Sequence, residues 1–467
     1  MVAWSLRSAV VVAFGLALVL AAPSFGPDAD LGDMRTLWLA FGLSVAGLAY
    51  CIDVPRLIYR TQAQEAQLDA SALRRLVLIV AAAGFIARAI QFAGTPIIED
   101  DYQRYLWDGA TTAHGLNPYS MSPADALLAP TNSLIRGLAD QGRETVESIN
   151  HPELKTIYPP VAQATFALAH AISPWSLTGW RLLCLIGELA TFGLLLQLLK
   201  LTGRSPLWIA LYWWNPLVIK ELMNSAHMEA VLMPLVLGSL WLSARHRHAG
   251  SIALVALAAG TKLWPLLLAP LVLRPLLPTP GKLIAGAAFL CGFVALCSLP
   301  VYFGGLDTTS GFVAYAHGWK TNSALSPALE EIARITLKGV GLDNAEPEWV
   351  VRLMLSGLIG FVAIYTARRP IDNPLDLMTR SALVVAALVI CSPAQFPWYM
   401  VWVMPFLVFL PVWGLLATTA FVPIFYSAFH FLEVDAYPIY RDTMVWIVWI
   451  PVWGLLIAEF HLNTRKR

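Results

Sequence analysis

The chain is dominated by apolar segments that are long enough to cross a lipid bilayer. A helix needs about 20 apolar residues to cross the hydrocarbon core, and runs of this kind recur throughout the sequence. Charged residues make up only 13% of the 467 residues, roughly half of their usual share in soluble domains. The sequence therefore predicts an all-α, polytopic transmembrane helical bundle with roughly 12–14 spans. The predicted spans lie near residues 5–23, 36–52, 76–96, 177–199, 205–222, 226–243, 283–303, 350–367, 378–392, 398–412, 413–431 and 443–460.

Basic residues are concentrated in a few connecting segments, which predicts the orientation of the bundle. Lys and Arg are enriched in cytoplasmic loops, and here they cluster in residues 53–75, 244–249 and 368–377 and in the tail 465–467. We therefore expect these segments and the C-terminus to be cytoplasmic. The acidic loop 97–157 should then lie on the opposite, extracytoplasmic side, and the expected location is the bacterial inner (plasma) membrane.

Two further apolar segments do not fit a simple alternation of spans. Residues 158–173 would have both ends on the external side, because Lys200 and Arg204 place the next loop in the cytoplasm. Either this segment is re-entrant or the charge rule fails there. Residues 251–278 contain a Gly-Thr-Lys-Leu-Trp-Pro break, which predicts a short hairpin or a broken helix lining a protein cavity.

Net charge and cysteine content exclude two other kinds of protein. The chain has 31 basic and 30 acidic residues, so its charge does not support a nucleic-acid partner. Its 5 cysteines lie in or beside apolar runs without metal-ligand spacing, and we interpret them as small core residues.

Three consecutive acids, Glu99, Asp100 and Asp101, follow the third predicted span, and Arg104 comes one helical turn after Asp100. A solvated first turn, whose acids complement the helix dipole, would explain them structurally. A carboxylate beside an apolar cavity would instead serve as a general base, because partial desolvation makes it more basic. Neighbouring helical residues point about 100° apart, so we expect one of Asp100 and Asp101 to face the cavity, and we favour Asp100.

A second group of polar residues lies between two predicted spans. Asn215 is part of a Trp-Asn-Pro sequence, and His227 and Glu229 follow it. Ionisable residues in such a place indicate a functional site, although a helix-end cap would also account for them. Zinc is not expected at His227, because neither a second histidine at ligand spacing nor a carboxylate triad accompanies it along the chain.

Two basic residues lie inside predicted spans or apolar segments. Lys262 is the single charged residue of an apolar stretch, and Arg88 lies within the third span. A buried charge is costly unless it is paired. A bound phosphate would provide such a partner, and an ion pair with a carboxylate of the protein is the alternative for both residues.

Aromatic residues mark two further positions near the external side. Tyr158 precedes two prolines where the chain returns to the membrane, and Trp398 and Tyr399 end the corner at 392–399. Helix punctuation and interface anchoring are the structural explanations. Contact with a ligand, such as stacking on a sugar ring, is the functional one.

The order of these motifs resembles the GT-C superfamily of membrane glycosyltransferases. It is most similar to the mannosyltransferase-like branch, which comprises glycosyltransferase family 87 and the glycosylphosphatidylinositol mannosyltransferases. The likeness covers most of residues 76–410 and is carried by the loop acids, Tyr-Pro-Pro at 158–160, Trp-Asn-Pro…His-x-Glu at 214–229 and Lys-Leu-Trp-Pro at 262–265. The loop acids are contiguous here, whereas that family often spaces them as Asp-x-Asp.

The resemblance implies a GT-C-type fold with a large external first catalytic loop and a hexose transfer reaction. A mannose-like sugar would pass from a polyprenyl-phosphate donor to a lipid or glycan acceptor at the extracytoplasmic face, with inversion. Asp100 or Asp101 would be the catalytic base, and Lys262 and His227 would belong to the donor site, with Arg104 or Arg88 adding charge at the phosphate. We expect substrate contacts from Glu99, Tyr158, Glu229, Asn215, Trp398 and Tyr399.

This interpretation divides the chain into a two-helix extension with its cytoplasmic loop, residues 1–75, and a glycosyltransferase domain, residues 76–467. The expected partners are the sugar donor, the acceptor and the bilayer. No required cofactor can be inferred, and the need for a divalent metal stays open. A transporter or lipid flippase is the rival from another class, although no internal repeat supports it. An O-antigen polymerase or ligase is the second rival, which would favour arginines over carboxylates in its external loops.

Overall fold

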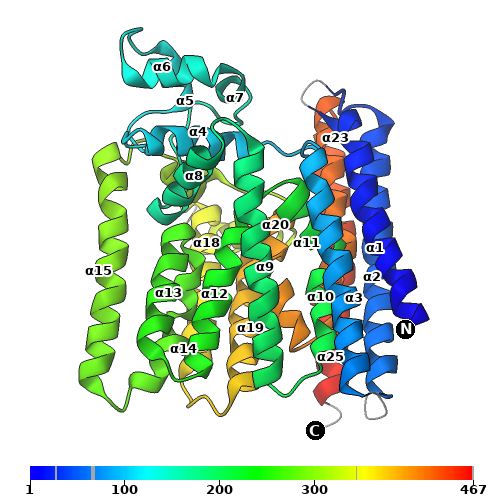
Figure 1. Cartoon of the computed structure of the whole chain (residues 1–467). Helices are drawn as coiled ribbons and strands as arrows, with labels where there is room; N and C mark the ends of the chain where they lie inside the picture. Colours follow the sequence, from blue (N-terminus) through cyan, green and yellow to red (C-terminus); the bar gives the residue numbers. More distant parts are fainter. Residues whose placement is uncertain (27–28, 65–68, 343, 465–467) are drawn as a thin grey trace.

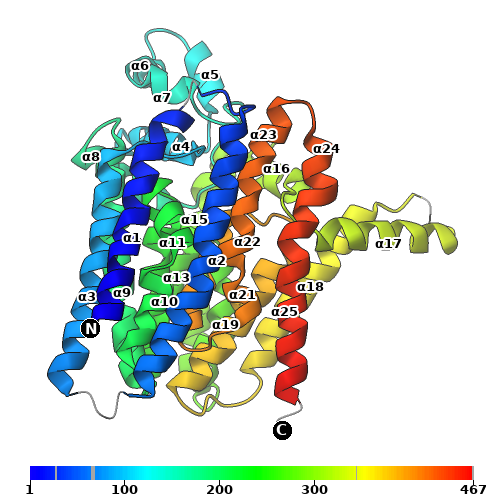
Figure 2. The same ribbon diagram turned by 90° about the vertical axis from the view of Figure 1, so that its right-hand side faces the viewer.

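The computed structural model describes residues 1–26, 29–64, 69–342 and 344–464, and these residues form an all-α bundle (Figures 1 and 2). Among them, 9 helical segments are long and apolar enough to cross a membrane, and one strongly bent helix pair raises the number to 10. The predicted polytopic helical fold is thereby confirmed. Eight of these segments contain the long helices α1 (Val2–Ala21), α2 (Met34–Gln62), α3 (Ala70–Ala89), α9 (Leu177–Leu201), α15 (Pro280–Gly304), α18 (Pro347–Ala367), α19 (Pro374–Cys391) and α25 (Val445–Thr464).

The number of long spans is smaller than the sequence predicts, because several apolar segments are divided into short helices. Proline removes a backbone donor and ends or bends a helix, and prolines recur in these segments. The ninth long segment itself, Trp413–Glu433, consists of four short pieces. The short helices are η4 (Pro206–Ile209), α10 (Ala210–Trp213), α11 (Pro216–Ile219), η5 (Lys220–Asn224), α12 (Glu229–Ala244), α13 (His248–Thr261), η6 (Trp264–Leu268), α14 (Ala269–Leu273), η7 (Arg274–Leu276), α20 (Pro397–Met400), η8 (Met404–Val408), α21 (Trp413–Leu416), α22 (Thr418–Phe421), η9 (Val422–Tyr426), α23 (Ser427–Glu433), α24 (Tyr437–Ile439) and η10 (Tyr440–Met444).

The loop 97–157 forms a helical cap at one end of the bundle. It contains α4 (Asp101–Ala113), α5 (Pro123–Leu128), α6 (Leu134–Gln141) and α7 (Arg143–Glu147), which lie at the upper end in Figure 1. The C-terminal end of α2, the N-terminal end of α3 and the turn between α18 and α19 lie at the opposite end. The basic segments and the acidic loop are therefore separated, as the charge pattern predicts. The tail 465–467 and residues 65–68 of the basic loop lie outside the described residues.

The ambiguous segment 158–173 forms a short helix beneath the cap. This helix, α8 (Pro160–Ile172), has 13 residues, a length of about 20 Å at 1.5 Å per residue, which is less than the bilayer core. It packs against α4 where Gly109 allows close approach, since a Cβ there would lie 2.4 Å from the carbonyl oxygen of Phe166. Because α9 starts at the same end (Figure 1), the arrangement agrees with the re-entrant alternative.

The N-terminal helices pack directly onto the rest of the bundle. A Cβ at Gly47 in α2 would lie 2.2 Å from the carbonyl oxygen of Thr419 in α22, and Figure 2 shows α2 beside α22. Arg7 of α1 also pairs with Asp53 of α2 at 2.7 Å. Helices α1 and α2 thus pack as part of one body with the other helices, and the separation of residues 1–75 as an extension stays a prediction.

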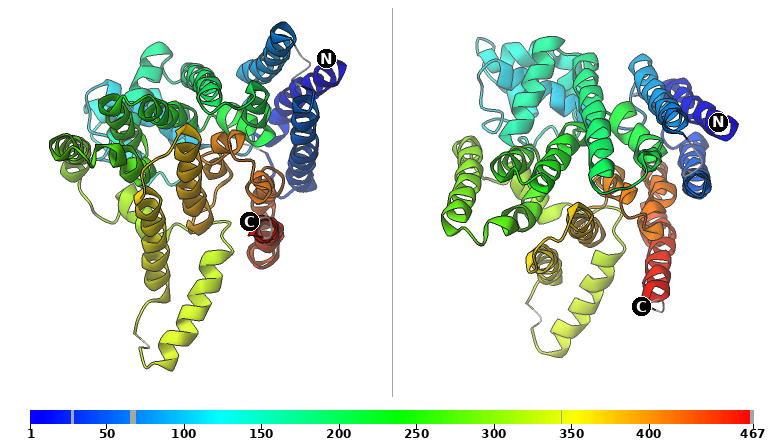
Figure 3. Two further views of the ribbon diagram at one scale, coloured as in Figure 1. Left: turned by 90° about the horizontal axis from the view of Figure 1, so that it is seen from below. Right: turned by 60° about the horizontal axis from the view of Figure 1, so that its bottom comes forward.

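One edge of the bundle projects outward. Figures 2 and 3 show α17 (Leu325–Gly339) extending away from the other helices beside α18. α16 (Gly311–Gly318) precedes it in the chain and lies at the upper end of the bundle (Figure 2). This edge matters for the site, because α16 and α18 line the cavity described next.

Candidate functional site

A cavity of about 1040 Å³ lies between the cap and the bundle. It is bounded by the start of α4, the break after α13, helices α16 and α18 and the corner at 392–402. Its volume is at the upper end of the range for small-molecule sites. Eight predicted site residues line it, namely Glu99, Asp100, Asp101, Arg104, Tyr158, Lys262, Trp398 and Tyr399.

The backbone is strained immediately before two of the site segments. Ile98 and Ala226 both have a φ of 57°, in the left-handed region that non-glycine residues rarely adopt. Ile98 directly precedes the three acids, and Ala226 directly precedes His227. Asn224 holds the two turns together, because its Oδ1 accepts a hydrogen bond from the Ile97 amide at 3.0 Å. Strain of this kind persists where the surrounding structure imposes it, often at functional sites.

Asp101 faces both the cavity and His227. Its Oδ2 lies 3.6 Å from Nδ1 of His227 and accepts long hydrogen bonds, both 3.5 Å, from the hydroxyls of Tyr105 and Tyr158. The expectation that only Asp100 faces inward is therefore wrong, because both aspartates line the cavity. The reason is local: helix α4 begins at Asp101, while Asp100 is its non-helical N-cap residue with a φ of −125°.

The two aspartates have opposite electrostatic environments. Burial, together with the negative charges of Asp101 and Glu99, raises the pKa of Asp100 to about 7. Burial also acts to raise the pKa of Asp101, but its polar contact with His227 and the positive charges of His227, Lys262 and Arg104 outweigh that effect and lower it. Asp101 is therefore the carboxylate that the site keeps ionised at neutral pH.

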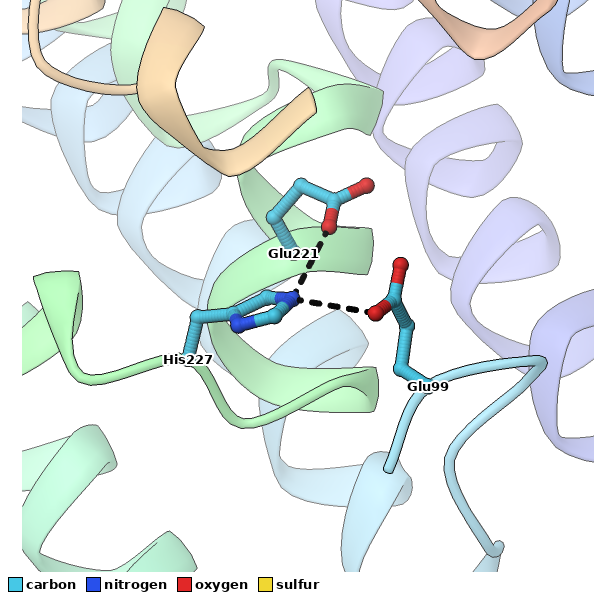
Figure 4. Close-up of side chains that lie close together, drawn as sticks. All are labelled: Glu99, Glu221 and His227. Carbon is cyan, nitrogen blue, oxygen red and sulfur yellow. Dashed lines mark ion pairs between the residues drawn. The ribbon is translucent and has the colours of Figure 1, made fainter. Parts of the chain in front are cut away.

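Behind Asp101 lies a buried cluster formed by Glu99, Glu221 and His227 (Figure 4). The Nε2 atom of His227 is 3.7 Å from Oε2 of Glu99 and 3.5 Å from Oε2 of Glu221. Lys220 approaches the Oε1 atoms of the same two carboxylates at 3.5 and 3.6 Å. Burial and the charges around it, with Lys220 and His227 opposing and Glu221 and Asp101 reinforcing, raise the pKa of Glu99 to about 7.

His227 is fully buried and stacks on Trp398, with ring centroids 4.1 Å apart. It does not line the cavity, so the structure does not place it against a donor. The 117° bend between η5 and α12 brings the His227 ring into contact with Glu99 and Asp101. Its contact with Asp101 makes it a residue that positions the carboxylate.

Lys262 forms an ion pair with Glu229, with 2.5 Å between Nζ and Oε1. The indole of Trp402 donates to the same oxygen at 3.3 Å, and the ammonium lies 4.6 Å from the ring centroid of Tyr399. α13 ends at Thr261, and Lys262 is extended, so the predicted helix break is confirmed. Lys262 reaches the cavity, while Glu229 is buried behind it.

Arg88 and Asn215 do not belong to the cavity. Arg88 is fully buried, lies 2.8 Å from Glu188 and donates to the carbonyls of Gly84 and Trp213. The structure therefore favours the inter-helix ion pair over a donor contact. Asn215 accepts hydrogen bonds from the first amides of α11 and donates to Thr419 at 3.0 Å. In this structure it caps a helix and does not line the cavity, and the expected substrate contact stays a prediction.

Several residues of the site are not among those predicted from the sequence. Glu221 and Lys220 had a visible signal, since they are adjacent charges in an apolar stretch. Tyr426 had no such signal, yet its hydroxyl lies within donating distance of both Glu99 and Glu221, at 2.9 and 2.8 Å. Arg352 lines the cavity and donates to the carbonyls of Ala316 and Trp319 at 2.8 and 3.3 Å. Its position depends on α16, which no local pattern predicts.

The fold and the cavity together define a polytopic helical membrane protein with an acidic, aromatic-lined site at one end. Residues 31–276 match the family described as alpha-(1->6)-mannopyranosyltransferase, N-terminal domain, and the chain belongs to that family. The match includes the three acids, His227 and Lys262. The chain is thus a membrane glycosyltransferase of the mannosyl kind. No curated protein and no solved structure matches it.

Proposed function

We propose that this protein transfers mannose from a polyprenyl-phosphate mannose to a hydroxyl of a glycan or lipid acceptor at the extracytoplasmic face. The observation that carries the proposal is the Asp101 carboxylate, which faces a cavity and is held from behind by His227. A general base must reach the proton that it removes, and Asp101 presents its carboxylate to the space where an acceptor would bind.

The cavity suits a donor with a lipid tail. Leu353 of α18 lines the cavity and is 69% exposed. We propose that the polyprenyl chain extends along this apolar part of α18. Asp101 lines the same cavity, so a sugar bound there could approach its carboxylate.

Positive charge for the donor phosphate is available along the cavity. Lys262 and Arg104 both line it, and Arg104 is held by the carbonyl oxygens of Leu154 and His151 at 2.9 and 2.8 Å. Among the described residues, Arg104 forms no direct ion pair with a carboxylate, although Asp101 and Asp108 lie near enough to act on its charge. We assign the phosphate to these two residues, with Lys262 also anchored by Glu229.

The proposed reaction is a single displacement at the anomeric carbon. The acceptor oxygen forms a bond to C1 as the bond between C1 and the phosphate oxygen breaks, and Asp101 takes the proton of the hydroxyl. The phosphate leaves with the bonding electrons, and Lys262 and Arg104 stabilise its developing charge. This displacement inverts the anomeric centre, so an enzyme that forms the α-(1→6) linkage of its family's description would consume a β-linked donor.

Aromatic side chains provide the surface on which the sugar would stack. Trp398, Tyr399 and Trp402 line the cavity, and the rings of Tyr399 and Trp402 are stacked with centroids 4.3 Å apart. Tyr158 lies across from Asp101 within 3.5 Å. We propose that Trp398, Tyr399 and Tyr158 contact the mannosyl group, and that Glu99 and Glu229 shape the polar floor beneath it.

The experiment is a transfer assay on the purified full chain in detergent or nanodiscs. Radiolabelled polyprenyl-phosphate mannose and an α-(1→6)-linked mannoside acceptor should give loss of donor and an acceptor extended by one α-linked mannose. A soluble nucleotide-linked mannose in place of the lipid donor serves as the control. Transfer from the nucleotide donor alone would refute the proposed donor class. Translocation of the lipid donor across the membrane of sealed proteoliposomes, without transfer, would favour the transporter.

A further inference from the structure

We propose that Glu99, Glu221 and His227 form a binding site for a divalent transition-metal cation. Each residue offers one ligand atom, and the three atoms lie within 4.8 Å of one another. The chain brings them from three places: the turn before α4, the π-helical segment η5 and the bend that precedes α12. Binding of the ion by the chain does not depend on the proposed function.

The spacing of the atoms leaves room for an ion. The distances of 3.5 and 3.7 Å from Nε2 of His227 to the two carboxylate oxygens are longer than ordinary hydrogen bonds. Ligand atoms held about 2.1 Å from one ion are about 3.4 Å apart in a tetrahedral arrangement. The three atoms are therefore too far apart to satisfy one another directly, but suitably placed to share a cation.

These ligand atoms also lack other partners. Among the described residues, both ring nitrogens of His227 and the Oε2 atom of Glu221 are buried without a hydrogen bond. The His227 and Glu221 side chains are 0% exposed, and that of Glu99 is 6% exposed. Buried polar atoms without partners are rare in folded proteins, which points to a bound group. Glu99 lines the cavity, so the ion can enter from there.

The surrounding residues orient the ligands as an outer shell would. The hydroxyl of Tyr426 lies between the Oε1 atoms of both glutamates and can donate its proton to either, and Lys220 lies near the same oxygens. The Oε2 atoms of Glu99 and Glu221 therefore point toward Nε2 of His227. Histidines that bind metals commonly hydrogen-bond a carboxylate through their other nitrogen, and here Nδ1 of His227 faces Asp101. Where the proposed function holds, the ion would therefore also fix the orientation of the base.

The ligand set indicates the class of ion. One imidazole nitrogen and two carboxylate oxygens suit Mn²⁺ or Zn²⁺, whereas Ca²⁺ and Mg²⁺ prefer ligand sets made of oxygen only. The carboxylates of Glu99, Glu221 and the neighbouring Asp101 face a single lysine ammonium, that of Lys220, and a divalent cation would offset their negative charge when they are ionised. The absence of zinc spacing around His227 in the sequence does not count against this, because the carboxylates come from other segments.

The test measures Mn²⁺ binding to the EDTA-treated full chain in nanodiscs by electron paramagnetic resonance. We expect one Mn²⁺ per chain, displaced by Zn²⁺ and not by equal Ca²⁺. Glu221→Gln and His227→Gln should each weaken binding by at least tenfold, since even outer-shell changes cost roughly 10–100-fold. The matched control is Glu229→Gln, a buried glutamate outside the group, which should bind Mn²⁺ as the wild type does.

A second measurement covers variants that fold poorly. Mn²⁺ should raise the unfolding temperature of the wild type, because a ligand of the folded state stabilises it, and should not raise that of Glu99→Gln. Lys220→Met should tighten Mn²⁺ binding, because it removes a cation that competes for the same carboxylates. Wild-type protein that binds no Mn²⁺, or equal binding by all variants, would overturn the proposal and leave a protonated His227 as the group that bridges the acids. Wild-type protein that binds Mn²⁺ but transfers no mannose would instead count against the proposed function alone.

Discussion

Asp101 and His227 lie in contact although they belong to separate segments, with Oδ2 of Asp101 3.6 Å from Nδ1 of His227. His227 is fully buried and is fixed by its stacking on Trp398. Burial and stacking restrict the histidine, so its contact with Asp101 favours one orientation of that carboxylate at the cavity. This relationship distinguishes Asp101 from its neighbour Asp100.

The first prediction concerns the identity of the base. Asp101→Asn should lower the rate of mannose transfer by about 10²–10⁴-fold, as expected for loss of a positioned base, with donor binding retained. Asp100→Asn is the matched control at the adjacent cavity residue and should cause a much smaller loss. Single-turnover assays with a lipid-phosphate donor would measure both. A larger effect at Asp100 would move the base to that residue, and wild-type turnover in the double variant would exclude both.

The second prediction concerns the donor phosphate. Lys262→Ala should weaken binding of the phosphorylated donor by roughly 10–150-fold, since a charge-assisted contact contributes about 1.5–3 kcal/mol. Lys262→Arg should restore only part of the affinity, because the guanidinium is larger and the lysine is enclosed by Glu229 and two aromatic rings. Equilibrium binding to the donor and to phosphate-free polyprenol would be compared. An equal loss for both ligands would make Lys262 a purely structural residue.

The third prediction concerns the buried pair of Arg88 and Glu188. Arg88→Met should destabilise the protein by about 3–5 kcal/mol, because it leaves Glu188 charged and unpaired in the interior. The double variant Arg88→Met with Glu188→Met should recover most of that stability. Thermal unfolding measures both, and donor affinity of the folded variants should equal that of the wild type. A selective loss of donor affinity would return Arg88 to the donor site.

The fourth prediction concerns orientation. A cysteine at Ser120 in the cap should react with an impermeant reagent from outside the cell, whereas one at Gln64 beyond α2 should react only after permeabilisation. The positive-inside rule and the position of the two residues at opposite ends of the bundle support this. Labelling of Gln64→Cys but not Ser120→Cys from outside would invert the orientation and place the cavity in the cytoplasm.

Apolar periodicity and charge were sufficient to predict the helical membrane fold, the acidic cap and the break at Lys262. They overestimated the number of long spans, because hydropathy counts an apolar segment such as 205–222 as one span. Prolines at 206 and 216 divide it into η4, α10, α11 and part of η5. Local sequence also predicted most residues that line the cavity, since Asp100, Asp101 and Lys262 are conspicuous charges beside apolar runs.

The sequence by itself determined that this chain must be a membrane bundle, because its apolar runs have no other way to leave water, and that its charges must be paired or functional. Only the tertiary structure decided which partner each charge has. Arg88 forms an ion pair with Glu188, and Lys262 forms one with Glu229. The bend before α12 places His227 between Asp101 and the two glutamates, Glu99 and Glu221. The physical reason is that Coulomb and hydrogen-bond interactions act over a few ångströms in space, and separation along the chain does not encode that distance.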